Sequence, residues 1–375
     1  MKLSDVVNRI NGNVDRYTTD LLYYIGGEHF ESNELEITNK AIIKDNLGIL
    51  GFKFHFAFQD RDVIFMARNP HLRKAGMVRF SGLCSDASYI LRSKDENILT
   101  QEYLAIQLQS DHFWDYCESH KVGSVNFANN WSSIANYEFD LPTIDKQREI
   151  ADKVWAAYEV KKAYRSMIKA TDEMVKSQFI EMFGNGNWEH KTLGEVGSFK
   201  RGGGFQKSDF VERGIPCIHY GQIHTRFGPF IYSHLTDISS DLESKTRFAE
   251  KGDLIIAITS EDTEGSCKST AWLGDYPVAV GGHAAIFHHC MNPVYMSFFF
   301  KSALFNYAKR EYVHGTKVCE IKPDDIAKIF VPCPPISLQE DFSAIAEQAD
   351  KSKFELKKAI EAIDKVIKSL INENL

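Results

Sequence analysis

The 375-residue sequence lacks several features that would assign it to a particular class of protein. Its longest apolar cluster, at residues 294–300, is far shorter than the roughly 20 residues that cross a bilayer, so we expect no contact with a membrane. The first residues have no apolar core followed by a small-residue cleavage site, which predicts that the chain is not secreted. The seven cysteines include no Cys-x-x-Cys pair, a usage typical of a reduced, cytoplasmic protein.

Motifs for catalysis and cofactor binding are missing as well. There is no Gly-x4-Gly-Lys-Ser/Thr loop for ATP, and the nearest fragments to the Asn-Pro-Pro-aromatic motif of adenine methyltransferases begin at Asn69 and Asn292. Glycines 202–204 are not followed by a helix signal, which argues against a dinucleotide site. The histidines between His219 and His289 have no carboxylate or cysteine partner at metal-ligand spacing. We therefore predict no catalytic residue, no cofactor and no metal site in this chain.

The sequence is organised by an internal repeat at an offset of about 192 residues. The stretches 123–142 and 315–334 match in length without a gap. The matched single residues are Gly123 with Gly315, Ile134 with Ile326, Pro142 with Pro334, and Gln147 with Gln339. Upstream, with small slips, residues 3–6 resemble 193–196 and residues 62–67 resemble 253–258. Matches in one order at nearly one offset indicate a duplicated body.

Each half of the repeat first reads as a mixed α/β globule. Short β-type runs bounded by Gly, Asn and Asp are expected at residues 52–58, 63–66, 87–91, 254–259 and 278–287. A helix is expected at 100–118 and again at 293–312. A Gly-Ser or Gly-Thr loop follows, and then a short apolar strand that ends in proline, at 137–142 and at 329–332.

After the proline, each half becomes strongly helical. Residues 145–183 contain no Gly or Pro, and at 1.5 Å per residue they make a rod of roughly 60 Å. Apolar or small side chains stand at 150, 154, 157, 164, 168, 171, 175 and 179, and the same stripe recurs 192 residues later. Taken alone, either rod is equally well explained as a dimerising coiled coil. Two rods of equal length in one chain favour antiparallel pairing within the chain.

These patterns predict an α+β fold in which two mixed α/β domains are separated by two long antiparallel coiled-coil helices, with an internal pseudo-two-fold repeat. The predicted parts are a first domain at 1–142, a first spacer helix at 143–184, a second domain at 185–334 and a second spacer helix at 335–375. On or beside the helical seam lie Trp155, Tyr158, Tyr164 and Phe179, which packing or contact with a partner would explain.

A stiff spacer that holds two similar heads a fixed distance apart suits a duplex DNA target with two half-sites and a set gap. Because the two heads differ in sequence, the half-sites should differ too, which predicts an asymmetric bipartite target.

The order of parts is similar to that of the specificity (S) subunits of type I restriction–modification systems. The first helix opens with Leu141-Pro142-x4-Gln147, and the second opens with Pro334-Pro335-x3-Gln339. The second globule also begins with Thr-Leu-Gly-Glu-Val at 192–196, continues through Gly-Ile-Pro-Cys-Ile at 214–218, and closes on Gly-Thr at 315–316. The resemblance covers essentially the whole chain. The chain departs from the family pattern at Lys146 and Leu338, which replace a usual Glu, and at Thr143, where a second proline is common.

The resemblance implies that the two domains are target-recognition domains that read double-stranded DNA. It implies that the helices set the gap between half-sites and dock two methyltransferase (M) subunits, and that restriction (R) subunits join this core. S-adenosylmethionine, ATP and magnesium would belong to those partners, and this chain would be a non-catalytic subunit. The net charge of −7 suggests that partners supply part of the phosphate neutralisation.

Candidate DNA contacts in the first domain lie in two loops. Arg68, Arg73 and Lys74 belong to a basic loop after the predicted strand at 63–66, where Arg and Lys suit base edges and phosphates. An ordinary solvated loop explains these residues about as well. Ser124 and Asn126 follow Gly123, in the loop that recurs in both halves. That recurrence fits a shared phosphate contact or a turn that the fold needs.

The candidates in the second domain occupy the equivalent loops and two others. The loop equivalent to the basic loop, 260–268, is acidic and ends in Lys268, and acidic side chains can accept from cytosine N4. The loop after Gly315 contributes Thr316 and Lys317. The other candidates are Arg201 and Phe205 around the glycine run, and Gln222, His224 and Arg226 after the predicted strand near Ile218. The glycine run allows close backbone approach to a phosphate, although a plain turn explains it equally.

A rival hypothesis is a coiled-coil scaffold with two protein-binding or peptide-binding globules. Salt-dependent binding to a bipartite duplex, lost when the gap is shuffled, would exclude it.

Overall fold

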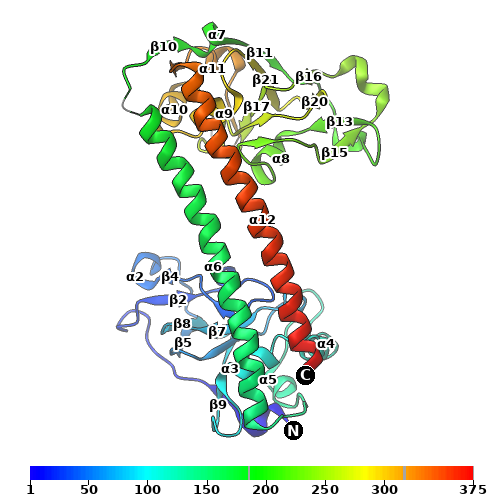
Figure 1. The fold of residues 1–375 in the computed structure, drawn as a ribbon. Helices are drawn as coiled ribbons and strands as arrows, with labels where there is room; N and C mark the ends of the chain where they lie inside the picture. Colours follow the sequence, from blue (N-terminus) through cyan, green and yellow to red (C-terminus); the bar gives the residue numbers. More distant parts are fainter. Residues whose placement is uncertain (185, 316–317, 375) are drawn as a thin grey trace. The chain divides into compact units, whose positions relative to one another are not determined.

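The computed structural model describes residues 1–184, 186–315 and 318–374. The chain divides into two compact units (Figure 1). Unit 1 comprises Met1–Met167 with Leu356–Leu375, and unit 2 comprises Ile168–Glu355. The division cuts both long helices, α6 (Ile144–Phe183) and α12 (Ile336–Asn374), so each unit holds one globule with a part of each long helix.

Unit 1 contains two sheets and short helices. The five-stranded sheet has the order β1 (Val7–Ile10), β9 (Ser88–Ser93), β6 (Val63–Met66), β7 (Ala75–Val78) and β3 (Glu36–Ile37). The four-stranded sheet has the order β4 (Ala41–Ile42), β2 (Tyr23–Ile25), β8 (Gly82–Ser85) and β5 (Phe54–Phe58). The helices are α1 (Leu3–Val6), α2 (Ile43–Asn46), α3 (Gln101–Gln107), α4 (Asp111–Ser119) and α5 (Trp131–Ala135), with 3-10 turns η1 (Gly27–His29) and η2 (Pro70–Leu72).

Unit 2 repeats this plan with some additions. Its first sheet has the order β11 (Gly197–Arg201), β21 (Ala284–His289), β17 (Leu254–Ala257), β19 (Ser269–Trp272) and β14 (Phe230–Ile231). Its second has the order β12 (Phe210–Val211), β15 (Thr236–Ile238), β13 (Ile215–Ile218), β20 (Val278–Val280) and β16 (Phe248–Ala249). Two-stranded ladders join β10 (Glu189–Thr192) to β23 (Phe330–Cys333), and β18 (Thr259–Ser260) to β22 (Cys319–Glu320).

The helices of unit 2 are α7 (Leu193–Val196), α8 (Tyr220–Thr225), α9 (Pro293–Phe299), α10 (Ala303–Ala308) and α11 (Pro323–Ile326), with 3-10 turns η3 (Lys207–Asp209), η4 (Ser240–Lys245) and η5 (Lys309–Tyr312). The predicted similarity of residues 3–6 to 193–196 corresponds to α1 and α7, which are both single helical turns.

The two units share one chain trace. The order β1-β9-β6-β7-β3 corresponds strand for strand to β11-β21-β17-β19-β14. The parallel pairs also correspond, because β2 with β8 matches β13 with β20, and β3 with β7 matches β14 with β19. Together with the two long helices, these repeated α/β globules confirm the predicted fold class.

Several predicted elements are interrupted. The expected helix at 100–118 is two helices, α3 and α4, and the helix at 293–312 is α9 and α10 followed by η5. Ser110 and Ser302 cause each break, because their hydroxyls accept from the amides of Phe113 and Phe305 and so cap a new helix. The run 278–287 is two strands, β20 and β21. The expected strand at 137–142 is reduced to a single bridge between Lys2 and Glu138.

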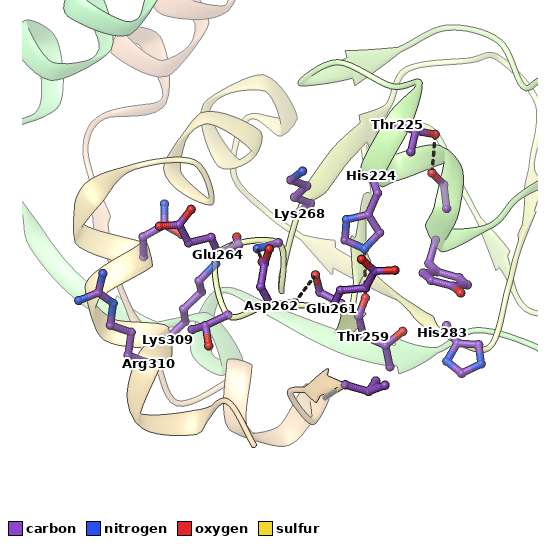
Figure 2. Close-up of a pocket in the computed structure, with 17 residues that line it drawn as sticks. His224, Thr225, Thr259, Glu261, Asp262, Glu264, Lys268, His283, Lys309 and Arg310 are labelled. Atoms are coloured by element: carbon purple, nitrogen blue, oxygen red, sulfur yellow. Dashed lines mark hydrogen bonds between the residues drawn. The ribbon is translucent and has the colours of Figure 1, made fainter. Parts of the chain in front are cut away.

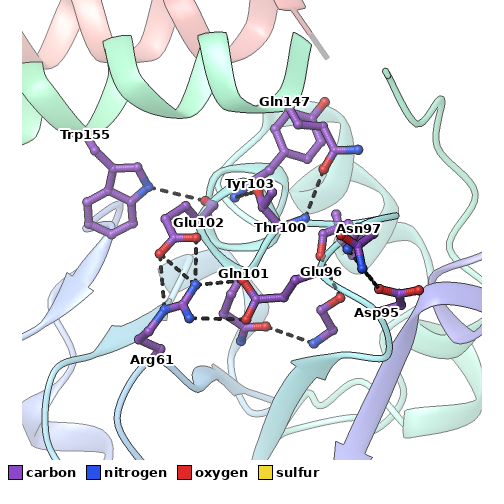
Figure 3. Close-up of polar contacts among 12 residues, drawn as sticks. Arg61, Asp95, Glu96, Asn97, Thr100, Gln101, Glu102, Tyr103, Gln147 and Trp155 are labelled. Atoms are coloured by element: carbon purple, nitrogen blue, oxygen red, sulfur yellow. Dashed lines mark hydrogen bonds and ion pairs between the residues drawn. The ribbon is translucent and has the colours of Figure 1, made fainter. Parts of the chain in front are cut away.

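The long helices run antiparallel within each unit. In unit 1, Lys161 of α6 contacts Asp364 of α12 at 2.5 Å, and Tyr158 shares a core with Ile367. In unit 2, Lys353 contacts Asp172 at 2.7 Å, and the ring of Phe342 packs on Phe179. The two ends of the predicted apolar stripe therefore pack in the cores that the helices share with their own globule. Trp155 and Tyr158 are packing residues, and Trp155 also donates to the Glu102 carbonyl at 3.3 Å (Figure 3).

The glutamine of each Pro-x4-Gln motif ties a long helix to its globule. Gln147 accepts from the amide of Thr100 at 3.0 Å (Figure 3). It also donates to the carbonyls of Ile98 and Pro142. Gln339 does the same with the amide of Asn292 and the carbonyl of Pro334. Thr100 and Asn292 are the N-cap residues of α3 and α9. Both glutamines are buried, so their amide groups satisfy backbone groups that water does not reach.

Candidate nucleic-acid interface

The glycine loop that recurs in both halves is the same tight turn in both units. Val122 and Ala128 exchange two backbone hydrogen bonds across the Gly123 turn (residues 122–128), and His314 and Glu320 do so across the Gly315 turn (residues 314, 315 and 318–320). Gly123 has a φ of 107° and Gly315 a φ of 105°, a conformation that L side chains rarely adopt. The turn geometry therefore accounts for both glycines.

In unit 1 this turn lies beside the end of strand β6. Arg68 bridges to Ala128, and the amide of Asn69 donates to the carbonyl of Phe127 at 2.8 Å. Arg68 is exposed, and its guanidinium has no partner within the described residues. Ser124 and Asn126 are also exposed on the turn. The structure thus brings together three of the predicted residues of unit 1 on one open surface.

The other two predicted residues of the basic loop are engaged inside unit 1. Arg73 contacts Asp111 of α4 at 2.5 Å, and Lys74 donates to the carbonyl of Gly27 at 2.7 Å. These contacts hold the 68–74 loop against the globule. A role for either residue in DNA contact would require it to leave its partner, so the prediction for this loop now rests mainly on Arg68.

Unit 2 has a cleft of about 1080 Å³ at the equivalent place (Figure 2). Strand β18 pairs with β22 of the Gly315 turn, as Arg68 pairs with Ala128 in unit 1. Exposed Lys268 and Arg310 line the cleft, and neither side chain has a partner within the described residues. His224 and His283 lie on its other side in Figure 2.

An acidic loop forms the centre of this cleft. Glu261 and Glu264 are exposed and unpaired in the described part of the chain, whereas Asp262 accepts from the amide of Gly265 and closes a turn. The buried ammonium of Lys309 donates to the carbonyls of Glu264 and Ser266 at 3.0 and 2.6 Å and fixes the loop from below. Burial lowers the pKa of Lys309.

The expectation that Gln222, His224 and Arg226 lie in a loop after a strand is wrong in its local structure. Gln222 and His224 lie on helix α8, and Arg226 is its C-cap. Gln222 is buried, accepts from the amide of His219 and donates to Thr236, so it is a structural residue. His224 contacts the carbonyl of Thr259 at 3.0 Å at the edge of the cleft. Arg226 is exposed without a partner in the described chain.

The glycine run after β11 serves backbone packing. A Cβ atom at Gly202 would lie 2.3 Å from the carbonyl of Gly281, and one at Gly203 would lie 2.7 Å from the carbonyl of Lys245. Arg201 donates to the Gly282 carbonyl and pairs with Glu320, and Phe205 is partly buried in a small core. Close packing explains Gly202 and Gly203 without a phosphate, whereas an added Cβ at Gly204 would meet nothing within 4 Å. Thr316 and Lys317 lie outside the described residues.

Sequence reasoning missed several residues at these surfaces. In unit 2, His283 and Arg310 also line the cleft. His283 immediately precedes β21, and Arg310 lies in η5. In unit 1, Lys121 lies 4.6 Å from the ring centre of Phe127 on the turn, and Arg9 lies over Tyr89 at 4.3 Å. Lys121 directly precedes the turn in sequence, whereas only the folded chain shows that His283 and Arg310 line the same cleft as residues 259–265. From the sequence, only the 192-residue offset of the repeat indicated which loops of the two units are equivalent.

The structure adds two findings on the classes of site present. Within residues 1–184, 186–315 and 318–374, no three His, Cys, Asp or Glu side chains are grouped so that they could hold a metal ion. No helix in the described chain is long and apolar enough to span a membrane.

The similarity to solved structures extends over the whole chain. A chain from a study of complex assembly and conformational transition of the type I R-M system is 18% identical, with a TM-score of 0.53, and the match covers 100% of this chain and 97% of that one. The type I restriction–modification system S subunit from M. genitalium is 12% identical, with a TM-score of 0.56, and the match covers 100% and 95%. No protein-family model and no curated protein matches the sequence. The chain therefore has the fold of a type I restriction–modification S subunit.

Proposed function

We propose that this chain is the DNA sequence-specificity subunit of a type I restriction–modification complex. One observation supports this most strongly, namely that the whole chain, with its repeated globules and both long helices, matches the fold of an S subunit. Each globule would be a target-recognition domain that reads one half of a bipartite duplex target. The chain itself would carry out no catalysis and would bind no cofactor.

The two half-sites would differ because equivalent positions carry opposite chemistry. Arg68 stands beside the Gly123 turn, and the equivalent place beside the Gly315 turn carries Ser260, Glu261 and Glu264. A guanidinium suits the O6 and N7 acceptors of guanine, and a carboxylate accepts from cytosine N4. We infer that unit 1 reads its half-site with a cation and unit 2 reads its own with carboxylates flanked by Lys268 and Arg310.

The partners would be two methyltransferase subunits on the long helices, with restriction subunits joined to that core, in the cytoplasm. They would carry S-adenosylmethionine, ATP and magnesium. The net charge of −7 supports shared DNA binding, since few unpaired cations lie at the two turns among the residues that the structure describes. We therefore expect weak DNA affinity from the chain alone and strong affinity from the complex.

The test is methylome sequencing of cells that express this chain with its neighbouring methyltransferase. We expect one asymmetric bipartite motif with a fixed gap. Replacing residues 1–140 with another family member's domain should change one half of the motif only. No association with the methyltransferase, together with no methylated motif, would favour the scaffold hypothesis instead.

Single substitutions test the assigned contacts. Arg68→Ala should weaken or relax recognition of one half-site by about 10-fold, since one good bidentate base contact is worth about 1–3 kcal/mol. Lys44→Ala removes a different exposed cation of unit 1, on α2, and is the matched control. Equal effects of the two variants would mean that Arg68 supplies only general charge.

A further inference from the structure

A second pair of equivalent clefts lies between the long helices and each globule. In unit 1 a cleft of about 600 Å³ is lined by Lys161, Asp364 and Lys368, and we call it the Asp111 cleft after the residue at its rim. In unit 2 a cleft of about 750 Å³ is lined by Lys353, Asp172 and Lys176, at the positions equivalent to those three. We call it the Lys176 cleft.

The Asp111 cleft satisfies its own charges. Asp111 contacts Arg73 at 2.5 Å and Lys368 at 3.2 Å, and these cations lower the pKa of its carboxyl. Lys161 is buried between Glu34, at 2.8 Å, and Asp364. Gln109 is buried beside them and donates to the carbonyls of Glu34 and Ala75. No cation of this inner group is left for a ligand.

Two substitutions within the repeat reverse this balance in unit 2. Ala303 stands where unit 1 has Asp111, and Lys301 stands where unit 1 has Gln109. The side-chain ammonium groups of Lys176 and Lys301 consequently have no hydrogen bond or ion pair within the described residues, whereas Lys353 is held by Asp172 and Asp350. Lys301 is an exposed residue that lines the cleft. Partial desolvation by the surrounding cleft atoms, with Lys353 and Lys176 nearby, lowers its pKa to about 8. The cleft therefore carries net positive charge, because three lysines line it with only two aspartates, Asp172 and Asp350, among the described residues.

The walls of the Lys176 cleft are apolar. Phe179, Phe298 and Trp188 line it, and Trp188 is fixed by donating to the carbonyl of Phe183 at 3.1 Å. The apolar surface continues past the rim, because Ile180 is 64% exposed and Leu304 is 53% exposed. Exposed side chains of this size, grouped around a cleft, are typical of a binding surface for another protein.

We propose that the Lys176 cleft binds an acidic, apolar segment of a partner protein, with leucine or aromatic side chains against the Phe179 wall and carboxylates on Lys176 and Lys301. The equivalent Asp111 cleft does not bind such a segment, because its lysines already have carboxylate partners. A chain segment fits better than a fatty acid, since a single carboxylate leaves one lysine unpaired and the apolar rim extends beyond the cleft. This inference concerns protein binding and does not depend on the proposed reading of DNA.

The test uses the full chain and two fluorescein-labelled 16-residue amphipathic peptides. One carries Leu and Phe on one face with Glu on the flanks, and the other has Lys in place of every Glu. Fluorescence polarisation at low salt should show binding of the acidic peptide and at least tenfold weaker binding of the basic one. Tenfold corresponds to about 1.4 kcal/mol, which suits one or two partly desolvated ion pairs.

A variant that makes unit 2 resemble unit 1 is the decisive comparison. Lys301→Gln with Ala303→Asp should weaken the acidic peptide about tenfold or more, because it removes one cation and gives Lys176 a carboxylate. Position 303 is the first residue of α10 after its N-cap, where Asp is favourable, so the fold should be retained. Lys351→Gln, on the exposed face of α12, is the matched control and should leave affinity unchanged.

Three results would overturn the proposal. They are equal binding of the acidic and basic peptides, unchanged affinity of the double variant with an unchanged melting temperature, and binding of dodecanoate but not of the acidic peptide. The last result would assign the cleft to a fatty-acid-like ligand. None of these results bears on the methylated motif, so the proposed function is tested separately.

Discussion

Units 1 and 2 have the same chain trace and different surface chemistry. The residues that hold the backbone are the same in both: a buried glutamine at 147 and 339, a positive-φ glycine at 123 and 315, and a buried aspartate at 62 and 253. The residues that differ stand at the turn and at the cleft. Arg68 of unit 1 corresponds to Ser260 of unit 2, and Asp111 corresponds to Ala303. The comparison separates positions that make the fold from positions free to determine binding.

The largest expected effect comes from the two glutamines. Gln147→Leu should lower the free energy of unfolding by about 3 kcal/mol, because it leaves one amide and two carbonyls without a partner in a buried place. Gln339→Leu removes fewer bonds and should cost about 2 kcal/mol. Thermal unfolding measures the loss of stability in each variant, and amide hydrogen exchange shows which unit loses protection. A smaller loss at Gln147 than at Gln339 would contradict the bond-by-bond explanation.

A pH effect should belong to unit 2 alone. Burial lowers the pKa of His289 to about 4, while the equivalent position in unit 1 is Ser93. The unfolded chain takes up this proton near pH 6.5, so stability should fall by about 2 kcal/mol between pH 7 and pH 5. His289→Ser should remove that part of the pH dependence. An identical pH slope in the variant, measured by urea unfolding, would show that other groups cause it.

The turn glycines should tolerate no side chain in either unit. Gly123→Ala and Gly315→Ala should each cost about 1.5 kcal/mol, because a Cβ atom would lie 2.6 Å and 2.0 Å from the carbonyl oxygens of Asn126 and Val318. The substitutions should also disturb the surfaces beside each turn, so Gly123→Ala should affect one half-site only. Gly48→Ala, in open space, is the control. Equal stability of all three would refute the need for glycine.

The smallest expected difference concerns the two buried aspartates. Both aspartates accept from a backbone amide, of Gln59 and of Glu250. Asp62 also pairs with Arg92 through two nitrogens at 2.8 and 2.9 Å, whereas Asp253 pairs through one bond with His288, which is 76% exposed. Asp62→Asn should therefore cost about 1 kcal/mol more than Asp253→Asn, since a bidentate guanidinium pair is the stronger one. Double-mutant cycles with Arg92→Ala and His288→Ala measure the two coupling energies.

Much of the fold could be predicted because most elements occur twice in the sequence, at equivalent positions of the repeat. The strand at 63–66, the long helices and the shared glycine turn were expected and are present. The breaks before α4 and α10 were missed, because the capping role of Ser110 and Ser302 depends on local geometry. Helix α8 was missed because residues 220–225 were read as a loop.

The candidate contacts were harder to predict than the fold. Arg73 and Lys74 carry the right charge, but their partners lie 38 and 47 residues away, so a reading of the loop alone could not show that they are occupied. Arg68 stayed available because no carboxylate in the described part of the chain pairs with it. Whether a cation is available for a ligand depends on its neighbours in space, which the local sequence does not record.

The sequence by itself determined the duplicated plan, because hydrophobic periodicity, glycine and proline act over a few residues and are repeated at one offset. Only the tertiary structure decided which charges are neutralised. The two equivalent clefts are built on the same helices, yet one is closed by Asp111 and the other is left positive by Ala303 and Lys301. Ion pairing depends on distances of a few ångströms between residues far apart in the chain, and those distances are set only when the units fold.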